Sequence, residues 1–456
     1  MVGMMTGVLG VGNRLFALTG AMGGLAVSLL VAAAPAAAQL VPGAPAPTPV
    51  RDNDDDPLRA GPGLPGVGGY PGRGLQLRFD ILGRYEDNLG RRQAADSGYR
   101  LRPQAAGSYG LGLGQQGLFI NASVARDIFV DVPNLQDRDR FQVGAGLDYR
   151  LSRCSGTTGA GWQRSLMFQS DASAFGGFEQ ERTSFGITAS CRISGALGLN
   201  GSVLRSIVST ETGFGAAFDL SNWTYSAGLS FGSAGIGQFS LTASQTDSIM
   251  PGRQVLTQGG LFDDGLRQRS LRLGFNRGFG SKINLSLGLS YLDTQPNFAE
   301  QVIIIDNVPQ LVPRDSFSGA GFDAALDFNL SPRLGFQLTA GRSSFANPQV
   351  GAQFTIATNY AAIVNFRLSG TYALQAGVTR RENRYRGGFA SPLDPFIRVS
   401  DDLDRVFGQI SARLGRRLRL AFDVTHNRRR SNPSILNFSS TGVGLNLGFD
   451  LGRGQS

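Results

Sequence analysis

Apolar and polar side chains alternate with a period of two along most of the chain. Between residues 75 and 86, one register is apolar and the other is mostly charged or polar; the apolar register holds Leu75, Leu77, Phe79, Ile81 and Tyr85. Successive side chains of a β-strand point to opposite faces, so this pattern predicts a strand with one apolar face. The alternation recurs in residues 141–151, 283–291, 372–378, 418–424 and 443–449, and no segment after residue 72 shows a convincing helical period.

Reading the alternation along the whole chain predicts about 18 strands, with ends uncertain by a few residues. The predicted strands are 75–86, 99–111, 117–127, 140–152, 164–175, 182–193, 197–208, 222–232, 237–247, 268–279, 283–293, 318–330, 333–343, 353–368, 371–381, 404–415, 417–427 and 440–451.

The predicted connections alternate between short and long. The short ones are 112–117, 194–195, 232–237, 278–282, 331–332, 369–370 and 415–417, and the long ones lie near 87–98, 128–139, 209–221, 248–267, 294–317, 382–403 and 428–439. A meander with tight turns on one side and long loops on the other is typical of a transmembrane β-barrel, whose short turns are periplasmic. An even strand count then predicts that both chain ends are periplasmic.

The second register decides between a soluble sheet and a membrane barrel. It is rich in Gly, Ser, Asn, Gln, Thr and Ala with occasional Arg and Asp, as in a barrel lumen, whereas exposed soluble surface carries more Lys and Glu. A spanning sheet must pair all of its backbone groups, which closure achieves by removing the edges. The sequence therefore predicts an all-β fold, a transmembrane antiparallel up-and-down β-barrel whose apolar register faces lipid. A soluble β-solenoid would need a fixed short repeat, which the sequence does not show.

Composition narrows the partners. The formal net charge of +9 is carried almost entirely by Arg, since Lys282 is the one lysine. A basic chain suits an anionic membrane surface or a nucleic acid. The arginines are scattered along the chain, and no basic run is interleaved with aromatic residues as a single-strand groove requires. We therefore expect no nucleic-acid partner.

The region before the barrel divides into two predicted segments. Residues 1–38 are expected to be a secretory signal peptide, with Arg14, the apolar stretch Leu25–Val31 and small residues before a cleavage site at Gln39. Residues 39–72 are rich in Pro, Gly and Asp and are expected to form an extended periplasmic arm. The barrel is then predicted to span residues 73–456, integral to the outer membrane.

Charged residues of the polar register are the pore-lining candidates. The candidates are Arg78, Arg84, Arg100, Arg102, Arg150, Arg192, Arg272, Arg367, Arg413, Arg419, Asp148, Asp327 and Asp423. Rings of Arg favour anions in pores, but opposite charges on one face also pair with each other. We expect a mixed, mildly positive lumen with at most a weak preference for anions.

No catalytic, metal or cofactor site is predicted, and the protein is not expected to be an enzyme. His426 is the one histidine, with Asn427, Ser431 and Asn432 nearby, so a lipase site on the outer rim is a remote alternative to a polar girdle residue. One His and two Cys do not make a metal ligand set. Gly112, Gly114 and Gly117 match a dinucleotide motif, but predicted strands lie on both sides, which favours a glycine turn.

Two cysteines leave two alternatives open. Cys154 falls in a predicted periplasmic turn, and Cys191 lies near the periplasmic end of a predicted strand. The periplasm is oxidising, so a disulfide between them and a pair of free thiols are both consistent with the sequence.

The predicted long loop 294–317 contains the apolar run Val302–Ile305. Such a run in an outer loop fits either a segment folded into the pore or a hairpin that extends the barrel wall. We favour the hairpin, with its turn at Asp306-Asn307.

Short motifs at both ends of the barrel region resemble the β-barrel porin type 2 family. They are Arg84–Asn88 after the first strand, and Asp401-Asp402 and Arg430–Asn432 around the closing strands. The resemblance covers roughly residues 75–451. It implies a Gram-negative outer-membrane barrel, of a family in which some members are linked to exopolysaccharide export. Such barrels commonly end on an aromatic residue, whereas here Phe449 is followed by residues 450–456.

The sequence thus predicts a porin-like passage for solutes across the outer membrane, without a cofactor, and the resemblance adds secreted polysaccharide as an alternative cargo. The expected partners are outer-membrane lipid and the outer-membrane assembly machinery, to which the resemblance adds components of polysaccharide export. A structural or surface-display barrel with a plugged lumen is the alternative from a different functional class.

Overall fold

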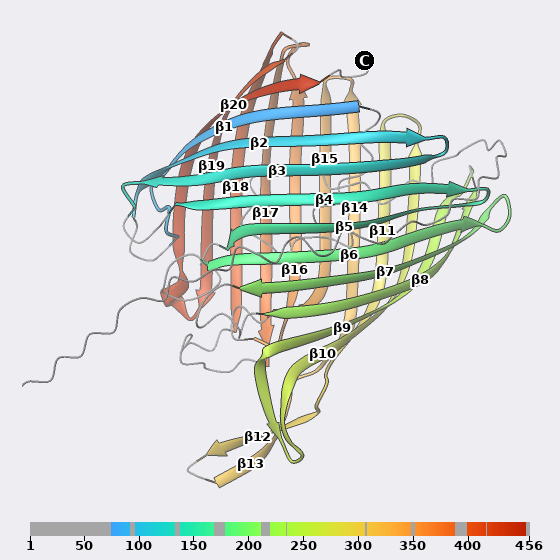
Figure 1. The fold of residues 1–456 in the computed structure, drawn as a ribbon, viewed down its shortest axis with the longest axis vertical. Coiled ribbons are helices and arrows are strands. Elements are labelled where there is room, and N and C mark those ends of the chain that lie inside the picture. Colours follow the sequence, from blue (N-terminus) through green and yellow to red (C-terminus); the bar gives the residue numbers. More distant parts are fainter. Residues whose placement is uncertain are drawn as a thin grey trace, which may run out of the picture. The chain divides into compact units, whose positions relative to one another are not determined.

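The computed structural model shows one closed, antiparallel barrel. It describes residues 74–91, 96–132, 137–167, 178–210, 219–233, 235–305, 308–347, 352–387, 399–415 and 417–452. Its main sheet has 18 strands, each paired with the next along the chain apart from the small hairpin β12–β13 (Figure 1). The first strand, β1 (Gly74–Glu86), also pairs with the last, β20 (Phe438–Gly452), and this pairing closes the barrel. The predicted fold class is confirmed.

The remaining barrel strands are uniform in length, apart from two long ones that form a projecting hairpin. They are β2 (Gly98–Leu113), β3 (Gln116–Val130), β4 (Arg138–Leu151), β5 (Cys154–Met167), β6 (Phe178–Arg192), β7 (Leu197–Thr210), β8 (Leu220–Ser233), β9 (Gly237–Thr257), β10 (Gly260–Phe279), β11 (Ile283–Pro296), β14 (Phe317–Ser331), β15 (Leu334–Ala346), β16 (Phe354–Arg367), β17 (Tyr372–Arg386), β18 (Ser400–Leu414) and β19 (Leu418–Asn432).

One predicted strand is badly placed. The sequence predicted 164–175, whereas β5 is Cys154–Met167. The reason is visible in its composition: Gly156, Gly159 and Gly161 interrupt the alternation, so no apolar register marks the strand. Pairing with β4 and β6 supplies the order that the local pattern lacks.

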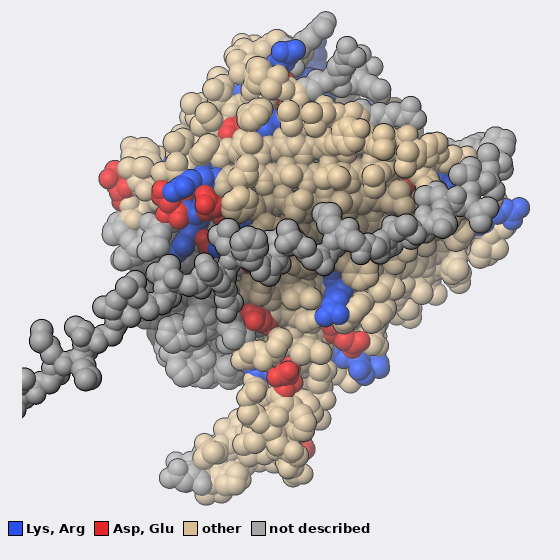
Figure 2. Space-filling model, in the orientation of Figure 1, with Lys and Arg blue, Asp and Glu red and all other residues tan. Residues whose placement is uncertain are grey.

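The apolar register faces away from the barrel interior throughout the wall. Leu289 keeps 63% of its surface exposed, Leu273 56% and Phe79 45%, and many further large apolar side chains of this register are similarly exposed. Monomeric soluble proteins rarely expose a continuous apolar surface of this extent. On the wall that faces the viewer in Figure 2, uncharged residues cover the centre and most of the charged residues lie toward the margins.

The connections differ between the two ends of the barrel. At one end, called here the short-turn end, β2 and β3 are joined by Gly114 and Gln115, and β4 and β5 by Ser152 and Arg153. Gly114 adopts a φ of +65°, which glycine tolerates without steric cost. At the other end, called the long-loop end, most connections are longer, such as 297–316 between β11 and β14. The predicted alternation of short and long connections is confirmed with one exception, the connection between β9 and β10.

Two hairpins project at the long-loop end. The predicted loop 248–267 is wrong, because β9 and β10 stay paired to a tight turn at Gln258 and Gly259, with a register shift at Asp263/Asp264. Inside the loop 294–317, β12 (Glu300–Ile305) and β13 (Val308–Pro313) form a separate two-stranded sheet. The favoured hairpin is therefore present, but it is not part of the barrel sheet (Figure 1).

Within the described part of the chain, the structure contains no helix of the length and apolar character that a membrane span needs. The predicted signal peptide 1–38 and arm 39–72 lie outside the described residues.

Candidate functional site: the barrel lumen

All of the predicted pore-lining residues lie on the inward register. Their cross-strand partners show this: Arg84 stands opposite Arg100, Arg272 opposite Ser290, and Arg413 opposite Arg419. Residues directly opposite each other in an antiparallel pair share one face of the sheet. Arg150, Arg192, Arg367 and Arg413 lie near the short-turn end and are exposed to the lumen opening there. Their role in conduction stays a prediction.

Several inward charges form ion pairs that pass over a glycine of the strand between them. Arg272 of β10 donates from Nε and Nη2 to the carboxylate of Asp323 on β14, at 2.6 and 2.5 Å. The strand between them, β11, presents Gly288 at this level, and a Cβ there would clash with the Asp323 carboxylate and with the Arg272 guanidinium. Glycine is therefore required for the two partners to meet across three strands.

The same arrangement closes the barrel seam. Arg84 of β1 donates from Nη1 to Asp423 Oδ2 of β19 at 3.0 Å, and it also bonds Thr425 of β19 and Glu86 of its own strand. The intervening strand β20 carries Gly444, where a Cβ would collide with the Asp423 carboxylate. Arg84 is 4% exposed, so its charge is compensated by these carboxylates and not by water.

A third cluster of charges joins β2, β3 and β4. Asp127, fully buried, accepts from Arg102 Nε at 2.6 Å and from Arg140 Nε at 2.5 Å. Arg102 was among the predicted pore-lining residues, whereas Asp127 and Arg140, at the ends of two predicted strands, were not. The alternation of polar and apolar side chains extends through both residues and could have identified them as inward-facing.

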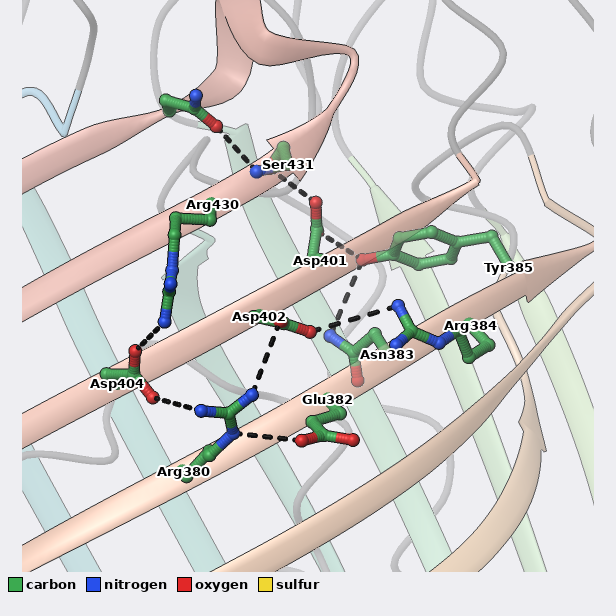
Figure 3. Close-up of polar contacts among 11 residues, drawn as sticks. Arg380, Glu382, Asn383, Arg384, Tyr385, Asp401, Asp402, Asp404, Arg430 and Ser431 are labelled. Carbon is green, nitrogen blue, oxygen red and sulfur yellow. Dashed lines mark hydrogen bonds and ion pairs between the residues drawn. The ribbon is translucent and has the colours of Figure 1, made fainter.

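A fourth cluster lies on the inward register near the long-loop end of β17, β18 and β19. Asp401 Oδ2 accepts from the Tyr385 hydroxyl at 2.5 Å and from Arg429, while Asp401 Oδ1 accepts from Ser431 Oγ at 2.5 Å. Asp401 is fully buried, and Figure 3 shows Tyr385 and Ser431 converging on it from the neighbouring strands. These contacts fix the register of three strands at the rim.

The long-loop end of the lumen is narrowed by a second layer of strand. Pairing of β14 with β15 stops at Phe322 and Arg342, although β15 continues to Ala346 in its pairing with β16. Beyond that point Ser344 bonds inward-facing residues of the wall: Gln268 Nε2 of β10 donates to Ser344 Oγ at 3.3 Å, and Thr294 Oγ1 of β11 lies 3.0 Å from it. The end of β15 therefore lies inside β10 and β11.

The start of β16 belongs to the same layer. Phe354 and Ile356 share the register of Tyr360, which is 43% exposed, yet they are 0% and 4% exposed themselves. They belong to one apolar cluster with the inward-facing Val208, Leu220, Met250 and Leu266 of β7–β10 and with Ala346. We call residues 343–347 and 352–357 the inner tip. Since it lies inside the wall, it occupies part of the lumen cross-section.

A buried ion cluster fastens the inner tip to the projecting hairpin. Arg253 of β9 donates from Nη1 to the Ala352 carbonyl at 2.9 Å, and its Nε lies 2.8 Å from Asp264 Oδ2 of β10. Arg314 Nη2 donates to Asp264 Oδ1 at 2.7 Å. All three side chains are buried, so each depends on the others for compensation. We call Arg253, Asp264 and Arg314 the latch.

The loop 294–317 contributes to the latch through Arg314, and not through its apolar run. Val302–Ile305 lies in β12, of which Ile304 is 64% exposed. The residue after Arg314 makes a further link, since Gly387 donates its backbone N–H to Asp315 Oδ2 at 2.9 Å. The apolar run Val302–Ile305 is therefore not the segment that narrows the lumen. The inner tip is that segment.

The predicted lipase alternative has no geometric support. His426 lies on the outward register of β19, where its Nδ1 is 3.0 Å from Thr441 Oγ1. Ser431 lies on the inward register of the same strand and donates to Asp401. A nucleophile and its base must be within hydrogen-bond reach, whereas these two side chains lie on opposite faces of the wall.

The two cysteines are joined. Cys154 opens β5 and stands directly opposite Cys191 of β6, with a disulfide between them and 4.0 Å between the Cα atoms. Cys154 lies in a strand and not in the predicted turn, because β5 begins ten residues earlier than the sequence predicted. Among the described residues, no group of His, Cys, Asp and Glu side chains is placed to hold a metal ion.

Among the comparisons with known proteins, only the one with solved structures finds similar proteins. No family model matches the chain, and no curated protein is similar to it. OpdL of Pseudomonas aeruginosa is similar at 13% identity and a TM-score of 0.43, covering 83% of this chain and 98% of that one. A BenF-like porin from Pseudomonas fluorescens Pf-5 is similar at 10% identity and 0.44, covering 84% and 100%. The siderophore receptor PirA of Pseudomonas aeruginosa is similar at 11% and 0.43, covering 83% and 81%. Likenesses at this level do not assign the chain to a family, so the resemblance to the β-barrel porin type 2 family stays a prediction.

Proposed function

We propose that the protein is a porin-like channel of an outer membrane. The observation that supports this is the division of one closed sheet into two chemically different faces. The outward face exposes large apolar side chains, as a lipid-facing wall requires, and the inward face carries polar and ion-paired residues. In this proposal both chain ends are periplasmic, because the barrel begins and ends at the short-turn end.

The proposed channel has a restricted mouth. The inner tip narrows the lumen at the long-loop end, and the latch holds it there. Most of the lumen charges described above are paired, so we expect modest selectivity between anions and cations. Solutes then pass by diffusion along a polar wall, with access limited by size at the long-loop end.

Conductance in planar lipid bilayers tests the proposal. The purified barrel should insert and give discrete current steps at constant voltage. Replacing the apolar contacts of the inner tip by Phe354→Ser together with Ile356→Ser should raise the step size, because the tip loses its packing against β7–β10. A barrel that inserts and never conducts in either form would refute the channel.

A plugged structural barrel is the second candidate, favoured by the inner tip itself. If the tip closes the lumen completely, the wild-type barrel inserts without conducting, and the double substitution alone opens it. Surface-display or structural roles would then follow, with the lumen serving only to anchor the loops.

Passage of secreted polysaccharide is a narrower form of the channel proposal. It is supported by the resemblance carried by Arg84–Asn88 and Arg430–Asn432, together with the partners expected from it, the assembly machinery and polysaccharide-export components. Deletion of the protein should then abolish secreted polysaccharide without loss of its synthesis inside the cell. Normal secretion in the deletion strain would leave a solute channel as the function.

A further inference from the structure

A network of charged side chains lies on the outward face of the barrel, where the rest of the register is apolar. It consists of Arg380, Glu382, Arg384, Asp402, Asp404 and Arg430, from β17, β18 and β19 (Figure 3). Arg380 and Asp404 stand opposite each other, and the next outward pair toward the short-turn end is Val378 and Val406. These valines are 50% and 54% exposed. The network therefore borders the apolar belt directly, on its long-loop side.

The arrangement of the network directs its positive groups outward. The carboxylate-bearing side chains are 26–31% exposed, whereas those of Arg380, Arg384 and Arg430 are 45–52% exposed. Arg380 Nε donates to Glu382 Oε1 at 2.9 Å, and Arg430 Nη2 to Asp404 Oδ2 at 2.8 Å. The carboxylates thus lie deeper and hold the guanidiniums in place. A guanidinium has five N–H donors, so each arginine keeps donors directed away from the wall.

This geometry fits phosphate groups at the boundary between hydrocarbon and water. Planar guanidinium groups bind phosphate through paired, charge-assisted hydrogen bonds. Arg384 on β17 and Arg430 on β19 are two strand spacings apart, about 10 Å across the sheet, and Arg384 lies two residues further toward the long-loop end. One small head group with a single phosphate engages one of these positions, whereas a head group with phosphates at two separated positions engages both. Acyl chains of the same molecule would lie against Val378 and Val406.

We propose that this outer charge network binds the phosphorylated sugar head group of a glycolipid in the membrane leaflet on the long-loop side. The inference rests on the proposed placement of the barrel in an outer membrane. It adds to that placement a specific lipid site on the outside of the wall, remote from the lumen. Binding there would also fix the height of the barrel in the membrane at β17–β19.

Native mass spectrometry of the detergent-purified barrel tests the site. The probes are bis-phosphorylated lipid A, dephosphorylated lipid A and phosphatidylglycerol. Wild type should retain bis-phosphorylated lipid A at least about tenfold more tightly than either other lipid, because each lost charge-assisted bond costs about 1.4 kcal/mol or more, a tenfold change. The variant Arg380→Gln, Arg384→Gln, Arg430→Gln should lose this preference.

Arg267→Gln is the matched control. Arg267 also lies outward near the long-loop end and is 51% exposed, but it pairs with the single carboxylate of Asp247 on the β9–β10 wall. This variant should bind lipid A as wild type does, and migration of unheated samples in gels should show that all variants are folded. Equal binding of the dephosphorylated lipid or of phosphatidylglycerol, or unchanged binding by the triple variant, would overturn the site. Conductance is recorded on the same preparations. A barrel that conducts but shows no lipid preference contradicts the lipid site and leaves the proposed channel intact.

Discussion

At the scale of single residues, the lumen depends on glycines as much as on charges. Gly444 and Gly288 each lie beneath an ion pair whose partners come from the two flanking strands. A side chain at either position would occupy the space of the carboxylate. The high glycine content, 64 residues, is therefore partly a requirement of side-chain packing on the inward face and not only of turns.

Gly444→Val tests this requirement. The added side chain should displace Asp423 and leave Arg84 poorly compensated, so we expect the free energy of unfolding to fall by about 1–3 kcal/mol. Urea unfolding in detergent, followed by tryptophan fluorescence, measures the change. Gly408→Val is the matched control, because a Cβ at Gly408 meets nothing within 4 Å. Equal stability of the two variants would contradict the argument.

At the scale of elements, strand order and alternation could be predicted from the sequence, and departures from the wall could not. Each predicted strand overlaps a barrel strand, since the period of two reports which side chains contact lipid. The inner tip carries the same period, so Phe354 and Ile356 resemble lipid-facing residues in the sequence. No local feature of the sequence distinguishes an apolar register that packs inside the barrel, against β7–β10, from one that faces lipid.

Asp264→Asn tests the latch. Removing this carboxylate deprives the buried Arg253 and Arg314 of the anion that they share, a loss on the order of 3–5 kcal/mol that favours release of the inner tip. Single-channel conductance should increase, and current fluctuations should become larger as the tip moves. The exposed pair Arg267–Asp247 provides the comparison, since Asp247→Asn should leave the conductance unchanged. A conductance equal to that of wild type in Asp264→Asn would show that apolar packing alone holds the tip.

At the scale of the whole molecule, the two faces of one sheet differ in their chemistry. The outward face is apolar at the level of the belt and charged beyond it, at Arg380 and Arg430, whereas the inward face pairs its charges across strands. The formal charge of +9 belongs to the whole chain, and on both faces arginines are paired with carboxylates. Composition alone therefore does not give the charge of the lumen.

Ion selectivity measures the charge of the lumen directly. The reversal potential under a potassium chloride gradient should show a weak preference for chloride in wild type. Arg272→Gln should shift it toward cations and Asp323→Asn toward anions, because each substitution leaves one partner of the pair unneutralised in the lumen. Shifts in the same direction for both variants would show that this pair does not border the ion pathway.

The sequence by itself determined the barrel: its strand order, its apolar outside, its polar inside and its two unlike ends. These follow from local chemistry, because the period of two and the turn residues are written into each short stretch. The tertiary structure decided which charges meet, where the disulfide lies, and that the inner tip leaves the wall. Such contacts join residues far apart in the chain, and only the closed sheet brings them within reach of one another.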